Sequence, residues 1–181
     1  MTQELWKFKR VPEVTFAFRQ GDETPEGGGC PIGGEFVFKT TEELFANKRV
    51  IVFSLPGAFT PTCSTYQLPG FEEQYDNFKA KGIDEIYCVS VNDAFVMNEW
   101  AKALNISNVK VIPDGAYNFT RGMGMLVDMS AIGFGWRSHR YAAVINNGQV
   151  EQMFKEPEGT SENADPYGES SPEKVMTYLQ G

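Results

Sequence analysis

The sequence lacks the residues and patterns on which several classes of protein depend. Its three cysteines are an odd number and include no Cys-x-x-Cys pair, so they do not suggest the disulfide framework of a secreted domain. No apolar run approaches the roughly 20 residues that a membrane-spanning helix needs. Residues 1–7 lack the basic and then apolar pattern of a signal peptide. These absences favour the reducing cytoplasm and argue against a membrane partner.

Positive charge is also in short supply. The 16 Lys and Arg residues are outnumbered by 24 Asp and Glu residues, and the net charge of -8 argues against a nucleic-acid partner. The remaining composition is ordinary for a globular protein, with 41% hydrophobic and 22% charged residues. A chain of 181 residues is long enough to bury a substantial core, and we expect one domain covering residues 1–181.

Apolar runs and helix-start signals alternate along the chain and predict an α/β fold. Helices between buried strands imply a mixed sheet covered by helices on both faces, preceded by an N-terminal β-hairpin. The predicted strands are residues 14–18, 35–39, 50–54, 86–91, 109–112, 141–145 and 149–154. The predicted helices begin near Thr40, Thr60, Phe71, Asp93 and Ser171. Pro69-Gly70 should kink or break the helix that begins at Thr60.

The most informative residue is Cys63, which closely follows the predicted strand 50–54. Thr60 can be the N-cap of the next helix, and Pro61 suits its first position. Cys63 then falls in the first turn, where backbone N–H groups are unpaired and the helix dipole places partial positive charge. Both effects favour the thiolate, which is the nucleophilic form of cysteine. The alternative is a buried structural cysteine.

These residues resemble a known family. Pro56, Thr60 and Cys63 form the Pro-x-x-x-Thr-x-x-Cys pattern of peroxiredoxins. Pro56-Gly-Ala-Phe-Thr-Pro-Thr-Cys-Ser64, Val89-Ser-Val-Asn-Asp-Ala-Phe-Val96 and Arg140-Tyr141 resemble the peroxiredoxin 5 (type II) subfamily. Gly122-Met-Gly-Met-Leu126 and Gly133-Phe-Gly135 are similar to the peroxiredoxin domain of bacterial peroxiredoxin–glutaredoxin hybrids. The resemblance implies a thioredoxin-like fold and thiol-dependent reduction of peroxides.

The chemistry of peroxide reduction suggests what the site needs. A thiolate attacks one peroxide oxygen, and negative charge moves from sulfur to oxygen, so a cation and hydrogen-bond donors are required. No metal or other cofactor is required. Arg140 matches the catalytic arginine of the family, and its guanidinium offers a permanent charge and forked donors. The Thr60 hydroxyl can hold the peroxide, and Pro56 shields the sulfur of Cys63 from water. The product is a Cys63 sulfenic acid.

Each assignment has a plainer alternative. Thr60 could be an N-cap and nothing more, and Arg140 could be a surface or ion-pair arginine with Arg137 as its competitor. His139 is the single histidine and could act as a general base, but we interpret it as a polar neighbour of the two arginines. The segment Gly122-Met-Gly-Met has neither the preceding strand nor the third glycine of a phosphate-binding loop. We expect packing or dimer-contact roles for Met123, Met125, Phe134 and Trp136.

The other two cysteines bear on how Cys63 is recycled. Cys88 lies in a predicted buried strand and should be inert. Cys30 lies in the glycine-rich loop 27–34, where it is either a loop thiol without function or a resolving cysteine that attacks the sulfenic acid. Two-cysteine peroxiredoxin 5 proteins carry the resolving cysteine in the loop after the last strand, but residues 158–166 contain none. This departure favours a one-cysteine cycle with glutathione as reducing co-substrate and a glutaredoxin as partner; thioredoxin remains an alternative reductant.

Two rival functions and an assembly follow from the same residues. A thioredoxin-like disulfide oxidoreductase would need a second cysteine near Cys63, and residues 64–71 provide none. A peroxide sensor or redox relay could use Cys63 and pass oxidation to a protein partner. Family resemblance implies a homodimer packed near the rim of the site, with Gly133-Phe-Gly135 as a candidate contact.

Overall fold

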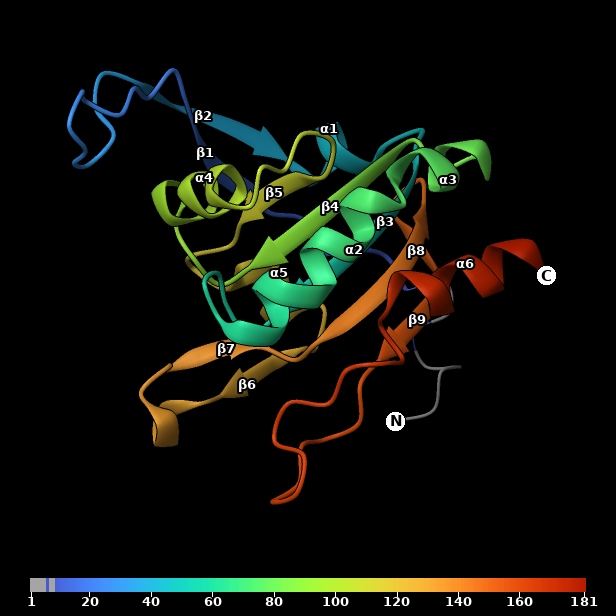
Figure 1. Cartoon of the computed structure of the whole chain (residues 1–181). Coiled ribbons are helices and arrows are strands. Elements are labelled where there is room, and N and C mark those ends of the chain that lie inside the picture. The colour runs from blue at the N-terminus through green and yellow to red at the C-terminus, as the bar shows by residue number, and fades with distance from the viewer. Residues whose placement is uncertain (1–5, 7–8) are drawn as a thin grey trace.

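The computed structural model describes residue 6 and residues 9–181 (Figure 1). Residues 1–5 and 7–8, which carry most of the segment tested for a signal peptide, lie outside the described residues. The centre is a five-stranded mixed sheet with the order β5-β4-β3-β8-β9. Strands β3 and β4 are parallel, as are β4 and β5, whereas β8 is antiparallel to β3 and to β9. The bounds are Arg49–Leu55 (β3), Glu85–Ser90 (β4), Lys110–Pro113 (β5), Tyr141–Asn146 (β8) and Gln149–Lys155 (β9).

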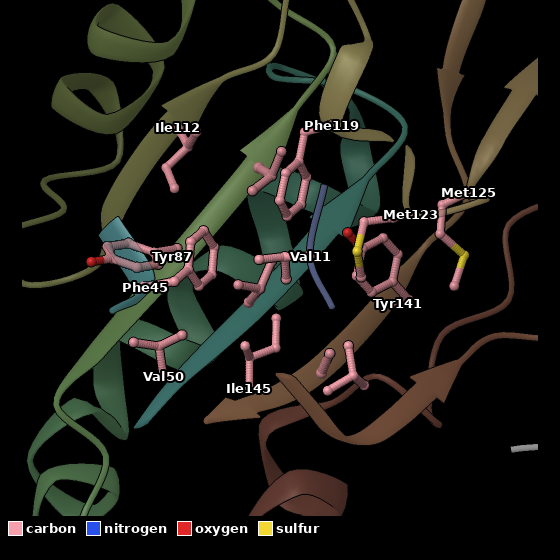
Figure 2. Close-up of a cluster of buried hydrophobic side chains, with 14 of the residues drawn as sticks. Val11, Phe45, Val50, Tyr87, Ile112, Phe119, Met123, Met125, Tyr141 and Ile145 are labelled. Carbon is pink, nitrogen blue, oxygen red and sulfur yellow. The ribbon is translucent and has the colours of Figure 1, made fainter. Parts of the chain in front are cut away.

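The sheet is buried on both faces because its central strands are apolar at successive positions rather than at alternate ones. Side chains of a strand point alternately to opposite faces. Val50 and Val52 therefore join one buried cluster, which Figure 2 shows with Phe45, Tyr87 and Phe119. Ile51, Phe53 and Leu55 join a second cluster on the other face. This arrangement confirms the thioredoxin-like fold with a mixed sheet covered on both faces.

The second cluster holds the helix that carries Cys63. Phe71 of α2 (Leu68–Glu73) stacks on Phe53 of β3 with ring centroids 4.3 Å apart, and both side chains are fully buried. Helix α3 (Tyr75–Ala80) adds Phe78, whose ring centroid lies 5.8 Å from that of Phe71. Trp100 of α4 (Ala94–Ala103) completes this face, and its indole N–H donates to the Ser64 hydroxyl at 2.9 Å.

The predicted N-terminal hairpin is confirmed. Strand β1 (Thr15–Gln20) pairs antiparallel with β2 (Glu35–Thr40). Helix α1 (Thr41–Phe45) follows directly, with Thr40 as N-cap in a capping box that also uses Glu43. The hairpin between β8 and β9 is confirmed as well, and α6 (Pro172–Gln180) begins after the N-cap Ser171.

The helix does not break at Pro69-Gly70, because it continues from Gln67 into α2. The helix widens before the proline into a π-helical segment, η2 (Cys63–Gln67), in which the N–H of Leu68 donates to the Cys63 carbonyl five residues back. Pro69 lies at the beginning of α2, where its missing N–H costs little. The wider turn accommodates the proline ring, and the interruption falls instead at Gln74, between α2 and α3.

Short elements between residues 118 and 138 escaped the sequence prediction. They are α5 (Asn118–Gly122), β6 (Leu126–Asp128), the 3-10 turn η3 (Ser130–Ile132) and β7 (Trp136–Ser138). Strands of three residues are too short to show a period, so the pattern gave no signal. Met123 and Met125 are fully buried, which confirms packing roles, whereas Trp136 is exposed.

The stacked rings of Phe71 and Phe53 tie the Cys63 helix to the sheet. We expect Phe71→Ala to lower the free energy of unfolding by about 3–5 kcal/mol, since a fully buried ring would leave a cavity. Urea denaturation followed by circular dichroism measures the change. Phe71→Leu, which refills most of the space, should cost less. A loss below about 1 kcal/mol for Phe71→Ala would contradict the anchoring role.

Candidate active site

The site forms where β3 ends and the chain turns into a helix. Pro56 follows β3 directly, and the helical backbone begins at Pro61. Phe59 has a φ of 60°, an uncommon value for a residue other than glycine, and its ring is exposed. The Thr60 hydroxyl donates to the Gly57 carbonyl at 2.7 Å and closes this loop. Among the described residues it receives no hydrogen bond from the Cys63 N–H, so the expected capping contact is absent.

Cys63 lies in the first turns of the helix and is fully buried. Its Sγ atom is 3.4 Å from Nη1 of Arg140, which comes from the residue just before β8. The antiparallel register of β3 and β8 sets Ser54 opposite Tyr141 and so brings Arg140 to the end of β3 from which the Cys63 loop departs. Two residues 77 positions apart in the sequence therefore meet because of the sheet topology.

The guanidinium of Arg140 donates to acceptor atoms of three residues, one of which is Cys63. Nη1 also donates to the Gln67 carboxamide oxygen at 2.8 Å, and Nη2 donates to both carboxylate oxygens of Asp165 at 2.7 and 2.9 Å. Burial lowers the pKa of Arg140, but the charges of Cys63 and Asp165 outweigh it, and the net direction is upward. The guanidinium is therefore a permanent cation beside the sulfur. Its Nε is buried and has no hydrogen-bond partner among the described residues.

The sequence left Arg137 and His139 as neighbours with open roles. The Arg137 guanidinium donates to the Phe134 and Val91 carbonyls at 3.0 and 3.1 Å, and so it braces the backbone around the site. Burial and the nearby Lys155 lower the pKa of His139 despite Glu158, so its imidazole is neutral at pH 7. Of these cationic candidates, the structure places the Arg140 guanidinium at the Cys63 sulfur.

A buried polar chain links the site to the loop before α6. Gln67, fully buried, donates from Nε2 to the Ser170 hydroxyl at 3.2 Å. Glu156 accepts from that hydroxyl at 2.9 Å and from the backbone N–H groups of Gly168 and Ser170 at 2.7 and 2.8 Å. These contacts hold the beginning and the end of the loop together and carry Asp165 over Arg140. The Tyr66 and Tyr167 rings stack with centroids 6.3 Å apart, and the Arg140 guanidinium lies 6.0 Å from the Tyr167 ring centroid.

A pocket of about 130 Å³ opens on Arg140. Pro56, His139 and Asp165 also line it, whereas Cys63 does not. This is the scale of a few water molecules, which suits a small substrate. No group of three or more His, Cys, Asp or Glu side chains that could hold a metal ion occurs among residue 6 and residues 9–181. Within the same residues, no helix is long and apolar enough to cross a membrane.

The other two cysteines differ sharply in surroundings. Cys88 of β4 is fully buried, and burial raises the pKa of its thiol well above the ordinary range, as expected for an inert thiol. Cys30 is exposed in the loop between β1 and β2. Figure 1 shows that loop projecting from the molecule, well away from the beginning of the Cys63 helix.

Sequence reasoning missed Gln67 and Asp165. Gln67 had a signal, because it is four residues after Cys63 and lies on the same side of the helix. Asp165 had none, because it lies in an irregular loop 25 residues beyond Arg140.

The chain is similar to known proteins in both sequence and structure. The family described as Redoxin matches residues 20–167. A peroxiredoxin of Rhizobium etli is 58% identical over 174 residues, which are 95% of each chain. The hybrid peroxiredoxin hyPrx5 of Haemophilus influenzae is 50% identical over 171 residues, which are 94% of this chain and 65% of that protein. A solved structure of reduced Prx3 from Vibrio vulnificus with hydrogen peroxide has 36% identity and a TM-score of 0.82, covering 96% of this chain and 95% of that one.

The thioredoxin-like sheet and a cysteine in the first turns of a helix, against a buried arginine, define a redoxin whose chemistry runs through a thiol. The class is that of thiol-dependent peroxidases, which are oxidoreductases. Within it, this chain belongs to the peroxiredoxin family, in the type II, peroxiredoxin 5-like branch.

The contact between Arg140 and Cys63 generates a test. We expect Arg140→Met to slow alkylation of Cys63 by iodoacetamide about tenfold or more, because the substitution removes the permanent cation that lies 3.4 Å from the attacking sulfur. The rate is measured by mass spectrometry of the modified peptide. Arg137→Met is the matched control, since Arg137 donates to backbone carbonyls, and it should alkylate at the unmodified rate. Equal slowing in both variants would contradict a specific contact.

Proposed function

We propose that this peroxiredoxin reduces hydrogen peroxide and small organic hydroperoxides through Cys63. The observation that carries the proposal is the buried Arg140 guanidinium, which donates to Cys63 Sγ from Nη1 at 3.4 Å and keeps a buried Nε without a partner among the described residues. The Nη1 group holds the Cys63 sulfur beside a permanent cation, and the Nε group is a donor that a substrate oxygen can use. Such donors stabilise the charge that develops on oxygen in the transition state.

The reaction is a displacement at oxygen. The Cys63 thiolate attacks the terminal oxygen of the peroxide, which is the oxygen bonded to hydrogen; an S–O bond forms and the O–O bond breaks. The sulfur is oxidised to a sulfenic acid, and the peroxide is reduced to an alkoxide or hydroxide. That anion takes one proton from solvent and leaves as an alcohol or as water. Arg140 supports the leaving oxygen without giving up its own proton, because its pKa is raised.

Thr60 and Pro56 complete the site in this proposal. The Thr60 hydroxyl donates its hydrogen bond to the Gly57 carbonyl, so its oxygen lone pairs can accept a hydrogen bond from the peroxide O–H. Pro56 lines the pocket beside Arg140 and limits the access of water. Its ring has no N–H that would compete for the substrate.

Replacement of the nucleophile tests the central claim. We expect Cys63→Ser to abolish peroxide consumption, because a serine hydroxyl is not ionised at neutral pH and cannot be oxidised to the sulfenic acid. Peroxide is followed by the ferrous xylenol orange assay with excess reductant. Cys88→Ser is the matched control and should retain turnover if it folds, which circular dichroism checks. Full activity of Cys63→Ser would overturn the assignment.

For recycling, we propose a one-cysteine cycle with glutathione and a glutaredoxin. Glutathione thiolate attacks the sulfur of the Cys63 sulfenic acid, hydroxide leaves and takes a proton from solvent to become water, and a mixed disulfide forms. A glutaredoxin thiolate then attacks the glutathione sulfur and releases the Cys63 thiolate. Two observations support this cycle: residues 158–166 contain no cysteine, and Cys30 lies on a loop remote from the Cys63 helix. The hybrid-like sequence points to the same reductant.

Assembly and location belong to the same proposal. Phe59, Ile132 and Trp136 are exposed large apolar residues near the site and the β6–β7 hairpin, which suits a homodimer packed at its rim. Glutathione is plentiful in the reducing cytoplasm, which is where we place the protein.

The recycling route is tested with wild type and Cys30→Ser. We expect equal turnover of both with glutathione plus glutaredoxin, and little turnover of either with thioredoxin, because Cys63 needs no resolving thiol in this cycle. Oxidation of NADPH in the coupled reductase assays gives the rates. Thioredoxin-dependent turnover that disappears in Cys30→Ser would make Cys30 the resolving cysteine. Oxidation of Cys63 without multiple turnover, with lasting disulfides to a client protein, would instead favour a peroxide sensor or relay.

A further inference from the structure

Strand β2 leaves one edge of the N-terminal hairpin uncovered. Within the described part of the chain, β1 is its only neighbour in that two-stranded sheet, and Figure 1 shows β2 along the upper margin of the molecule. Phe36 and Phe38 are 52% and 65% exposed on this strand. A soluble protein rarely leaves a regular edge and two neighbouring phenylalanines open to water without a use for them.

The phenylalanine face is ordered before any partner binds. Phe36 and Phe38 stack with centroids 6.5 Å apart, and Phe36 meets Phe95 of α4 edge-on at 6.1 Å. The Arg19 guanidinium lies 4.7 Å from both the Phe36 and the Phe95 ring centroids and is held by an ion pair with Asp22. A partner would therefore meet a surface that loses little conformational freedom on binding.

The backbone of β2 offers its free hydrogen-bonding groups at the phenylalanines. The N–H of Thr41 donates to the Val14 carbonyl at 2.9 Å, which directs the backbone groups of Thr41 toward β1. In an antiparallel pair this direction alternates, and the register of β1 with β2 is regular from Thr40 to Glu35. The groups of residues 35, 37 and 39 thus point to β1, and those of Phe36 and Phe38 point to the open edge.

The sequence of β2 is complementary to itself. In the segment Glu35-Phe-Val-Phe-Lys39, a phenylalanine stands on each side of Val37, and the two end residues carry opposite charges. If two copies pair antiparallel about a twofold axis at Val37, Phe36 lies opposite Phe38 of the partner subunit, and Glu35 lies opposite Lys39 of the partner subunit. All four phenylalanines then share one face, and two oppositely charged pairs form on the other.

We propose that the β2 edge, residues 35–39, is an interface between two copies of this chain, which join their hairpins into one four-stranded antiparallel sheet. Phe36 exchanges two N–H···O=C bonds with Phe38 of the partner subunit, and the twofold axis doubles them. Val37 meets its own copy as a non-hydrogen-bonded pair, in which side chains lie closest.

The charges favour a second copy over another occupant. Edges that must stay unpaired carry lysines or inward-pointing charges, which repel a copy of the same strand. Here Glu35 and Lys39 attract their counterparts in the partner, and a random peptide would not match both. The net charge of -8 opposes association at long range, and the two matched charge pairs offset part of this repulsion at the interface.

This interface is separate from the rim of the active site. In Figure 1, β2 lies at the upper margin, whereas the beginning of the Cys63 helix and the β6–β7 hairpin lie toward the lower part of the molecule. Both surfaces can therefore be occupied at once, and the proposal holds whether or not the rim forms a dimer or Cys63 reduces peroxide.

Cross-linking tests the twofold pairing directly. In a Cys30→Ser/Cys63→Ser background, we expect Val37→Cys to form a disulfide-linked dimer on mild copper–phenanthroline oxidation. The α-carbons of such a pair lie about 4.5 Å apart, within the range that a disulfide spans. Asn77→Cys, exposed on α3, is the control for random collision and should cross-link at least about tenfold more slowly. Equal rates for the two variants would overturn the proposal.

A charge swap tests the register. We expect Glu35→Lys and Lys39→Glu to weaken association about tenfold or more in sedimentation velocity, since each sets like charges opposite one another twice. The double variant Glu35→Lys/Lys39→Glu should restore association, and a mixture of the two single variants should form the mixed assembly. Peroxidase activity should be unchanged throughout. A double variant as weak as the single ones, or single variants that associate like wild type, would refute the pairing.

Discussion

The contact between a buried arginine and a buried cysteine sulfur constrains the rest of this molecule. A guanidinium inside a protein loses its hydration and must be met by acceptors on several sides. Arg140 is met by Cys63, by the Gln67 oxygen and by Asp165, which come from a helix start, the next helical turn and a distant loop. Each of these segments is fixed in place by that requirement as well as by its own packing.

The sheet topology makes this meeting possible. Strand β8 runs antiparallel beside β3, so the residue before β8 reaches the end of β3 from which the Cys63 loop departs. The π-helical widening at η2 then brings Gln67 and Cys63 to the same guanidinium while Pro69 begins α2. The stacked Phe53 and Phe71 rings keep this helix against the sheet. Packing on one face of the sheet thus sets the electrostatics at its end.

Much of this could be predicted from the sequence, for physical reasons that differ between elements. Buried strands such as β3 and β4 can be predicted because they are long apolar runs. Helices α4 and α6 can be predicted from their N-caps, Asp93 and Ser171. Cys63 was found from its place after a strand, and Arg140 through family resemblance rather than from any local pattern. The hydroxyl of Thr60 binds Gly57 because a turn can satisfy it locally, which no spacing rule indicates. The position of Asp165 and the pairing of the short strands β6 and β7 depend on tertiary contacts, which the periodicity of the sequence does not indicate.

The tie between Asp165 and Arg140 also bears on how the loop before α6 can vary in evolution. Surface loops usually tolerate insertions and changes of length. In this loop, however, Asp165 must reach the guanidinium, and the backbone of Gly168 and Ser170 must reach the Glu156 carboxylate. We therefore expect changes of length to be tolerated mainly in the first part of the loop, around residues 159–163, and the second part to keep its spacing. A segment on the surface thus carries a constraint on its length that its exposure alone would not indicate.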